Sequence, residues 1–157
     1  MNTPAGADPS DRPVSDRPSS ARPVLEELDS QECLELISPG GVGRVAFDDG
    51  EGPAVIPVNY TVDGQAVVFR TSLEGRLNQS LATVLTGAAV RIAFQVDRID
   101  EQRHEGWSVL LRGGGQHLPD HERPTGATVE PWPGGDRPVY IRVEPQEISG
   151  RRLVHAG

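Results

Sequence analysis

The sequence predicts a mainly β protein in which antiparallel strands form a small barrel, closed or partly open. Three observations support this fold class. Apolar and polar residues alternate in several short segments, as they do in half-buried strands. Turn signals such as Asp63-Gly64 join neighbouring segments into hairpins. Only two short segments have helical periodicity, and strands joined mainly by hairpins favour a barrel.

The length of 157 residues fits one domain with a tail. Residues 1–22 contain almost nothing apolar, and repeated Arg-Pro steps such as Arg12-Pro13 disfavour a helix there. We therefore expect residues 1–22 to be a disordered tail and residues 23–157 to form the globular domain. Residues 24–28 are expected to be a short apolar lead-in to the first helix.

The first predicted element of the domain is a short helix of roughly two turns. Asp29 or Ser30 can cap it, and Glu32 lies three residues after Asp29, as in a capping box. Pro39-Gly40-Gly41 ends the helix. Cys33 lies on the apolar face, so core packing is favoured over a nucleophilic role.

Six segments are predicted to be strands, because apolar residues alternate along them or turn signals bound them. Their ranges are 42–48, 54–62, 65–71, 88–98, 107–111 and 139–143. Residues 74–86 have apolar residues at helical spacing and predict a second helix. Gly113-Gly114-Gly115 suggests a bulge or bend after the fifth strand, and residues 119–137 a Pro/Gly-rich loop. The result is a six-stranded antiparallel barrel with two or three short helices.

Every one of the 15 basic residues in this chain is an Arg, and there is no Lys. The lack of an amine side chain excludes a Schiff base with a carbonyl substrate or pyridoxal phosphate. It also excludes a Walker-type phosphate loop, which needs a Lys. The net charge of -8 argues against a surface for nucleic acid or for an anionic membrane.

Three features that the sequence lacks narrow the class of protein further. A single Cys gives no disulfide framework, and no apolar run is long enough for a transmembrane helix. The N-terminus lacks the apolar stretch of a signal peptide. We expect a soluble, cytoplasmic protein.

Cations and hydroxyls are concentrated between the third predicted strand and the second helix. Arg70, Thr71 and Ser72 end the strand, and Arg76 falls in the first helical turn. Arg side chains and free helix N–H groups are suitable donors to a phosphate. A bound anion would also offset the unfavourable interaction of Arg76 with the helix dipole. The alternative is that Arg70 and Arg76 are ordinary exposed charges, paired with Glu74 or an Asp.

Several short motifs occur in order over about residues 24–153. They are Gly43-Arg44-Val45-Ala46-Phe47, Pro57-Val58-Asn59-Tyr60, Phe69-Arg70-Thr71, Gly75-Arg76-Leu77, Phe94-Gln95-Val96-Asp97, Gly106-Trp107-Ser108-Val109 and Gly113. This order resembles the pyridoxamine 5′-phosphate oxidase-like family of FMN-binding proteins. The resemblance implies a split β-barrel that forms a homodimer, with two FMN molecules in the grooves between the subunits.

The resemblance implies three groups of flavin-binding residues. Those that flank the ring through backbone contacts are Ile56, Pro57, Val58 and Asn59. Those that hold the phosphate or line its pocket are Arg70, Thr71, Ser72, Arg76 and Leu77. Those that reach the flavin from the partner subunit are Trp107 and Ser108.

The chain departs from the family pattern in two places. Arg76 stands where the family usually has Lys, which keeps the charge but changes its shape and reach. The residues that bind the substrate phosphate in the true oxidase have no convincing match, and residues 150–155 resemble its C-terminal segment only superficially. Oxidation of pyridoxamine phosphate is therefore not predicted.

The sequence predicts an FMN-binding oxidoreductase that passes electrons from a reduced nicotinamide to a small acceptor. The cofactor would supply the chemistry, and no side chain stands out as a general acid or base. The alternative is a non-enzymatic flavin, deazaflavin or haem-binding module, such as a redox sensor or a cofactor carrier. It is motivated by the lack of substrate-side residues. A cofactor-free dimeric scaffold is a further alternative.

Three other residues are weaker candidates for a functional role. His117 and His121 could bind a metal if they shared a helix face, but Pro119 lies between them and no third ligand is evident. A polar loop is therefore favoured, with an axial haem ligand as another alternative. Trp132 could be an interface anchor, a flavin lid or a loop residue packed on the barrel.

Overall fold

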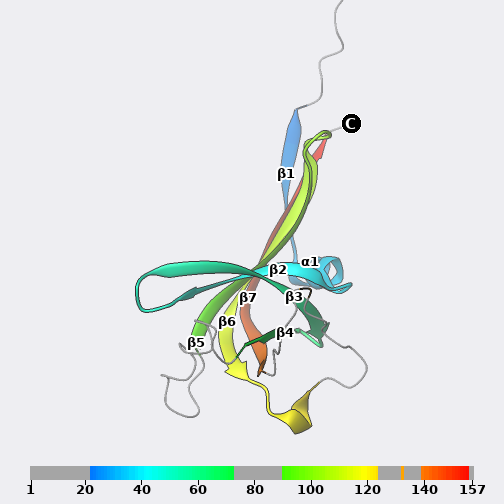
Figure 1. The fold of residues 1–157 in the computed structure, drawn as a ribbon. Helices are drawn as coiled ribbons and strands as arrows, with labels where there is room; N and C mark the ends of the chain where they lie inside the picture. The colour runs from blue at the N-terminus through cyan, green and yellow to red at the C-terminus, as the bar shows by residue number, and fades with distance from the viewer. Residues whose placement is uncertain (1–21, 73–89, 124–131, 133–138, 156–157) are drawn as a thin grey trace, which may run out of the picture.

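The computed structural model describes residues 22–72, 90–123, 132 and 139–155. Antiparallel strands dominate this part of the chain (Figure 1). The elements are β1 (Pro23–Leu28), α1 (Ser30–Ile37), β2 (Gly41–Asp48), β3 (Pro53–Asp63), β4 (Ala66–Thr71), β5 (Val90–Asp100), β6 (Glu105–His117), η1 (Asp120–Glu122) and β7 (Val139–His155). The predicted tail except Arg22, the predicted second helix and most of the Pro/Gly-rich loop lie outside the described residues.

Six strands close into a barrel. Their order is β7-β4-β3-β2-β5-β6, and the pairing of β6 with β7 closes the ring. All of these pairings are antiparallel. The seventh strand, β1, pairs only with the C-terminal part of β7 and lies outside the ring. The predicted fold class, mainly β with a six-stranded antiparallel barrel and few helices, is confirmed.

Local sequence signals account for the first helix and the best-defined hairpin. Asp29 Oδ1 accepts a hydrogen bond from the Glu32 N–H at 2.9 Å, and Glu32 Oε2 accepts one from the Asp29 N–H at 3.0 Å. This is the predicted capping box at the start of α1. Gly64 and Gln65 form the loop between β3 and β4, and the positive φ of Gly64, 62°, suits the first position of a type II′ turn. The predicted capping box and hairpin are confirmed, although the turn lies one residue later than Asp63-Gly64.

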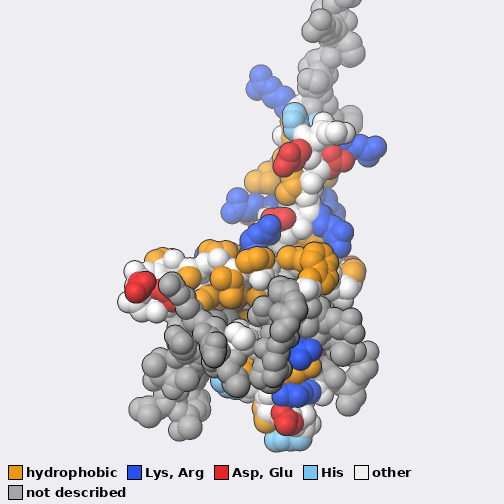
Figure 2. Space-filling view, in the orientation of Figure 1, with side chains coloured by type: hydrophobic (Ala, Val, Ile, Leu, Met, Phe, Trp, Pro, Cys, Tyr) orange, Lys and Arg blue, Asp and Glu red, His pale blue; other side chains and the backbone are white. Residues whose placement is uncertain are grey.

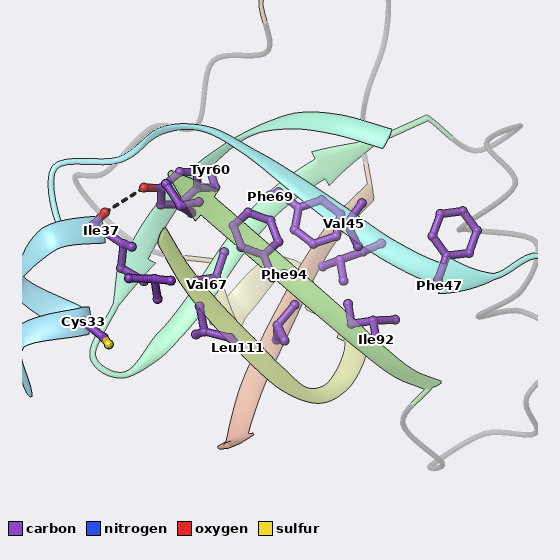
Figure 3. Close-up of a cluster of buried hydrophobic side chains, with 14 of the residues drawn as sticks. Cys33, Ile37, Val45, Phe47, Tyr60, Val67, Phe69, Ile92, Phe94 and Leu111 are labelled. Carbon is purple, nitrogen blue, oxygen red and sulfur yellow. Dashed lines mark hydrogen bonds between the residues drawn. The ribbon is translucent and has the colours of Figure 1, made fainter. Parts of the chain in front are cut away.

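The interior of the barrel is built around three aromatic rings (Figure 3). The centroid of the Phe94 ring lies 5.9 Å from that of Phe69 and 5.3 Å from that of Tyr60. The Tyr60 hydroxyl donates a hydrogen bond to the carbonyl oxygen of Ile37 at 2.9 Å, which fastens the end of α1 to the barrel (Figure 3). Burial raises the pKa of Tyr60 to about 12. Cys33 on α1 is also fully buried, so its predicted place in the core is confirmed.

The last strand is longer than the sequence predicts. The predicted strand ends at Val143, whereas β7 continues to His155. The alternation of apolar residues stops at Pro145 and the polar residues that follow it, so the continuation has no sequence signal. Pro145 cannot donate a backbone hydrogen bond, which is why proline in a sheet is confined to edges and bulges.

A β-bulge explains how β7 accommodates Pro145. Gly113 is opposite Pro145 while the preceding Arg112 is opposite Glu147, so Gln146 is an extra residue in β7. A Cβ atom on Gly113 would collide with the backbone carbonyl of Glu144. The irregularity predicted near the three glycines is therefore confirmed, although the extra residue belongs to the partner strand.

Residues 24–28, expected to be a lead-in, belong to a strand. Along its whole length β1 pairs with residues 150–155 of β7, from Pro23 opposite His155 to Leu28 opposite Gly150. The expectation was wrong because the segment lacks the alternation typical of a strand. It is ordered by a partner more than a hundred residues further along the chain.

The ends of four strands form an arm that projects from the barrel (Figure 1). We use "the arm" for β1, the tip of the β5–β6 hairpin (residues 97–108) and residues 150–155 of β7. Ile99, Gly106, Leu153 and Leu25 form one row across its four strands. Ile99 is 60% exposed and Leu25 is 55% exposed. Charged and hydrophobic side chains lie interspersed over the arm (Figure 2).

Candidate functional site

The ladder between β3 and β4 ends partway along both strands, and we call the region beyond its last rung the opening. This ladder runs from Asp63 opposite Ala66 to Tyr60 opposite Phe69. Beyond that rung, residues 56–59 of β3 pair with β2, and residues 70–71 of β4 pair with β7. Two groups of predicted cofactor residues, 56–59 and 70–72, therefore start next to the same rung and diverge from it. The structure places Asn59 and Arg70 next to this shared rung, and the other residues of the two groups further from it.

The β3 side of this opening consists mainly of backbone groups and uncharged side chains. Ile56 and Val58 are half-buried and pack against the core, whereas Pro57 is exposed. Since β3 is paired only with β2 here, a proline is tolerated within the strand. The Asn59 side chain accepts a hydrogen bond from the Trp132 backbone N–H at 2.9 Å, which ties a distant loop residue to the site. The Trp132 side chain is 78% exposed, so it is not packed on the barrel among the described residues.

The β4 side carries the polar groups. Thr71 is only 5% exposed and follows Phe69 on the inner face, while Arg70 and Ser72 are half-buried. The guanidinium of Arg70 lies over the Tyr140 ring, with its Cζ atom 5.0 Å from the ring centroid. Tyr140 is the residue opposite Arg70 in the β4–β7 ladder, so this contact follows from the strand register. The other two predicted phosphate-side residues, Arg76 and Leu77, lie outside the described residues.

A second Arg reaches the same ring. The Cζ atom of Arg123 lies 4.3 Å from the centroid of Tyr140. Arg123 also forms an ion pair with Asp120, with Nη2 to Oδ1 at 2.7 Å. No motif in the sequence points to Arg123. No sequence spacing relates Arg123 to Arg70. The two residues come near each other only through the register of β7 and the path of the chain around η1.

Trp107 and Ser108 lie on the arm, far from Arg70 of the same chain. Trp107 is ten residues before the end of β6 at His117, which corresponds to about 33 Å of strand. As neighbours on a strand, their side chains point to opposite faces. Trp107 lines a groove of about 470 Å³ with Arg98 and Arg152, and Ser108 lines a separate groove of about 450 Å³. One chain by itself does not bring either residue to the opening between β3 and β4.

The remaining candidates form no further site. His117 and His121 are exposed, and no group of three or more metal-ligating side chains occurs within the described ranges. Burial raises the pKa of the Cys33 thiol, so this thiol stays protonated near neutral pH. Within the same ranges, no helix has the length and apolar character needed to cross a membrane.

The fold is that of a known class of protein. The family model for pyridoxamine 5′-phosphate oxidase matches residues 29–152. That match covers most of the chain, so the protein belongs to this family of split-barrel proteins. The resemblance seen in the motif order is confirmed.

Relatives and solved structures agree with this assignment. The uncharacterized protein Rv0080 of Mycobacterium tuberculosis is 32% identical over 136 residues, which is 85% of this chain and 88% of the relative. The structure of an FAD-binding protein of Mycobacterium smegmatis has a TM-score of 0.61 at 24% identity, covering 82% of this chain and 98% of that one. A FAD-binding protein of Mesorhizobium loti gives 0.63 at 21% identity, covering 85% and 99%. At these identities the two structures show the shared fold.

Proposed function

We propose that the protein binds FMN and is an oxidoreductase that passes electrons from a reduced nicotinamide to a small acceptor. The observation that carries the proposal is the parting of β3 and β4 beyond the Tyr60–Phe69 rung, with Arg70 at the opening. Membership of the family and the shared fold of two FAD-binding proteins support it. Oxidation of pyridoxamine phosphate itself is not part of the proposal.

The residues at the opening fit the two ends of a flavin. The half-buried Arg70 and the Ser72 hydroxyl provide charge-assisted and neutral hydrogen bonds to a phosphate, with Arg76 and Leu77 assigned to the same pocket. The backbone of residues 56–59, paired on one side only, offers N–H and C=O groups to the edge of the ring. A bound flavin would supply hydride and electron transfer, and the chain would bind, orient and shield it.

The same proposal includes a homodimer with the cofactor between the subunits. Along β6, Trp107 and Ser108 lie about ten residues from the end of the strand that is near Arg70. A second copy of the chain would therefore have to bring them to the flavin. Because their side chains point to opposite faces of the arm, only one of the two can meet the same flavin through its side chain. The other would contribute through its backbone.

An absorption spectrum and a titration test the cofactor. Purified protein titrated with FMN should quench the flavin fluorescence, and reconstituted protein should show a flavin spectrum. Arg76→Ala should weaken FMN binding by about tenfold or more, since a hydrogen bond to a charged group is worth about 1.5–3 kcal/mol. Arg12→Ala in the N-terminal segment is the matched control and should leave binding unchanged. Colourless protein that quenches neither FMN nor FAD contradicts the proposal.

Steady-state assays separate an enzyme from a binding module. Flavin-loaded protein should oxidise NADH or NADPH with a quinone or a nitro compound as acceptor. Stable flavin binding without turnover would instead favour a redox sensor or cofactor carrier. A deazaflavin or haem spectrum in the purified protein would assign the same fold to another cofactor.

A further inference from the structure

We propose that Arg123 is a second phosphate-binding residue of this site, acting together with Arg70 beside the Tyr140 ring. The proposal rests on the proposed function and names a residue from a different part of the chain. The ligand chemistry is a terminal phosphate monoester, as at the end of the FMN side chain. The juxtaposition that supports it is the approach of two guanidiniums to the single ring of Tyr140.

The path of the chain brings Arg123 next to Tyr140. After β6 the Leu118 N–H donates to the carbonyl oxygen of Tyr140 at 2.8 Å, and Leu118 is buried at 7% exposure. η1 then turns the chain back, with the Arg123 N–H directed at the carbonyl oxygen of Asp120. In this way the chain is fastened to the first residues of β7 a few residues before Arg123.

The electrostatics of the pair favour an anion. Both Cζ atoms lie within 5.0 Å of one ring centroid, so two positive charges stand closer than about 10 Å, the Debye length at 0.1 M salt. Salt therefore screens their repulsion only in part. The face of Tyr140 stabilises each guanidinium through a cation–π contact but carries no net charge. A phosphate dianion would offset the repulsion.

Existing ion pairs are compatible with this role. Asp120, whose side chain is 88% exposed, pairs with one nitrogen of Arg123. A guanidinium has five N–H donors in a planar fork, so it can bind a carboxylate and a phosphate together. Figure 2 shows basic side chains next to the acidic and His side chains at the η1 end of the molecule.

The test compares FMN with riboflavin, which has the same ring system and no phosphate. Dissociation constants for both are measured by fluorescence titration of the full chain. Arg123→Ala should weaken FMN binding about tenfold or more, as expected for a charge-assisted hydrogen bond, and leave riboflavin binding within about twofold. The exposed Arg112, paired with Glu147 on the barrel surface, provides the control variant Arg112→Ala, which should change neither constant.

The outcomes separate this inference from the proposed function. Wild-type protein that binds neither flavin overturns both. Wild-type protein that prefers FMN, with an unchanged FMN-to-riboflavin ratio in Arg123→Ala, overturns only the role of Arg123. Equal losses for both flavins would show that Arg123 supports the fold instead of the phosphate. Arg123→Lys keeps the charge without the fork and should lie between wild type and Arg123→Ala.

Discussion

At the scale of single residues, Tyr60 is the clearest case in which packing changes the acidity of a side chain. Its ring closes the aromatic cluster of the barrel, and its hydroxyl caps the last turn of α1 at Ile37. The side chain is 5% exposed, so the ionised form of the phenol is disfavoured in the folded protein. Arg98 opposes this effect through its charge, but burial is the larger cause and raises the pKa to about 12.

This shift makes stability depend on pH in the alkaline range. The unfolded chain loses the Tyr60 proton near its ordinary pKa of 10.0, while the folded protein keeps it up to about 12. The unfolded state thus binds fewer protons between these values, and the free energy of unfolding falls as pH rises from about 10 to 12. Urea denaturation over this range measures the fall. The comparison uses Tyr140→Phe protein, in which Tyr60 is the only remaining Tyr.

Tyr60→Phe is the matched variant for that measurement. It keeps the ring but removes the proton and the hydrogen bond to Ile37. At neutral pH it should lose about 1 kcal/mol of stability. In the Tyr140→Phe background its stability should fall less steeply above pH 10 than that of the chain with Tyr60. Equal slopes in the two proteins would mean that Tyr60 is not the titrating group.

At the scale of elements, the bulge between β6 and β7 shifts the register of the last strand. The extra residue Gln146 reverses which residues of β7 face the barrel interior beyond it. Gly113 permits the close approach of the β7 backbone at this point.

Gly113→Ala should destabilise the fold because the added methyl would collide with the Glu144 carbonyl. We expect a loss of about 1–3 kcal/mol, typical of overpacking against a rigid neighbour. Thermal or urea denaturation measures it. Arg112→Ala, one residue earlier with its side chain exposed, should cost less than about 0.5 kcal/mol. Equal effects of the two substitutions would rule out the steric explanation.

At the scale of the whole molecule, the arm is the part of the described chain that a barrel alone does not need. Its two faces carry different residues, and the row of Ile99, Gly106, Leu153 and Leu25 leaves large apolar side chains exposed. In the proposed homodimer this row would contact the second copy, which would also bring Trp107 or Ser108 to the flavin. Exposed apolar rows of this kind are costly in water unless they are covered.

Ile99→Glu should therefore convert the dimer to a monomer and weaken FMN binding. Analytical ultracentrifugation should give about twice the chain mass of 16.9 kDa for wild type and the single-chain mass for the variant. Val55→Glu is the control, because Val55 is equally exposed at 60% but lies on β3, outside the arm. A monomeric wild type, or an Ile99→Glu dimer as stable as wild type, would contradict the arm as an interface.

Much of the fold follows from local patterns. The capping residues Asp29 and Glu32 start α1, Asp63-Gly64 marks the hairpin, and alternation places residues such as Phe69 and Phe94 in the core. Each of these signals acts within a few residues. The β1 strand and the end of β7 carry no such signal, because each is held by the other and by β6.

The candidate site likewise depends partly on local sequence and partly on the tertiary structure. The sequence by itself determined that Arg is the one strongly basic side chain available to bind a phosphate, since the chain has no Lys, and it placed Arg70, Thr71 and Ser72 at a strand end. Only the tertiary structure decided where β3 leaves β4 and which face of the arm each of Trp107 and Ser108 occupies. Arg123 likewise reaches Tyr140 only in the folded chain. The physical reason is that alternation specifies the face of a strand but not its partner, and partners are chosen by contacts between residues far apart in the chain.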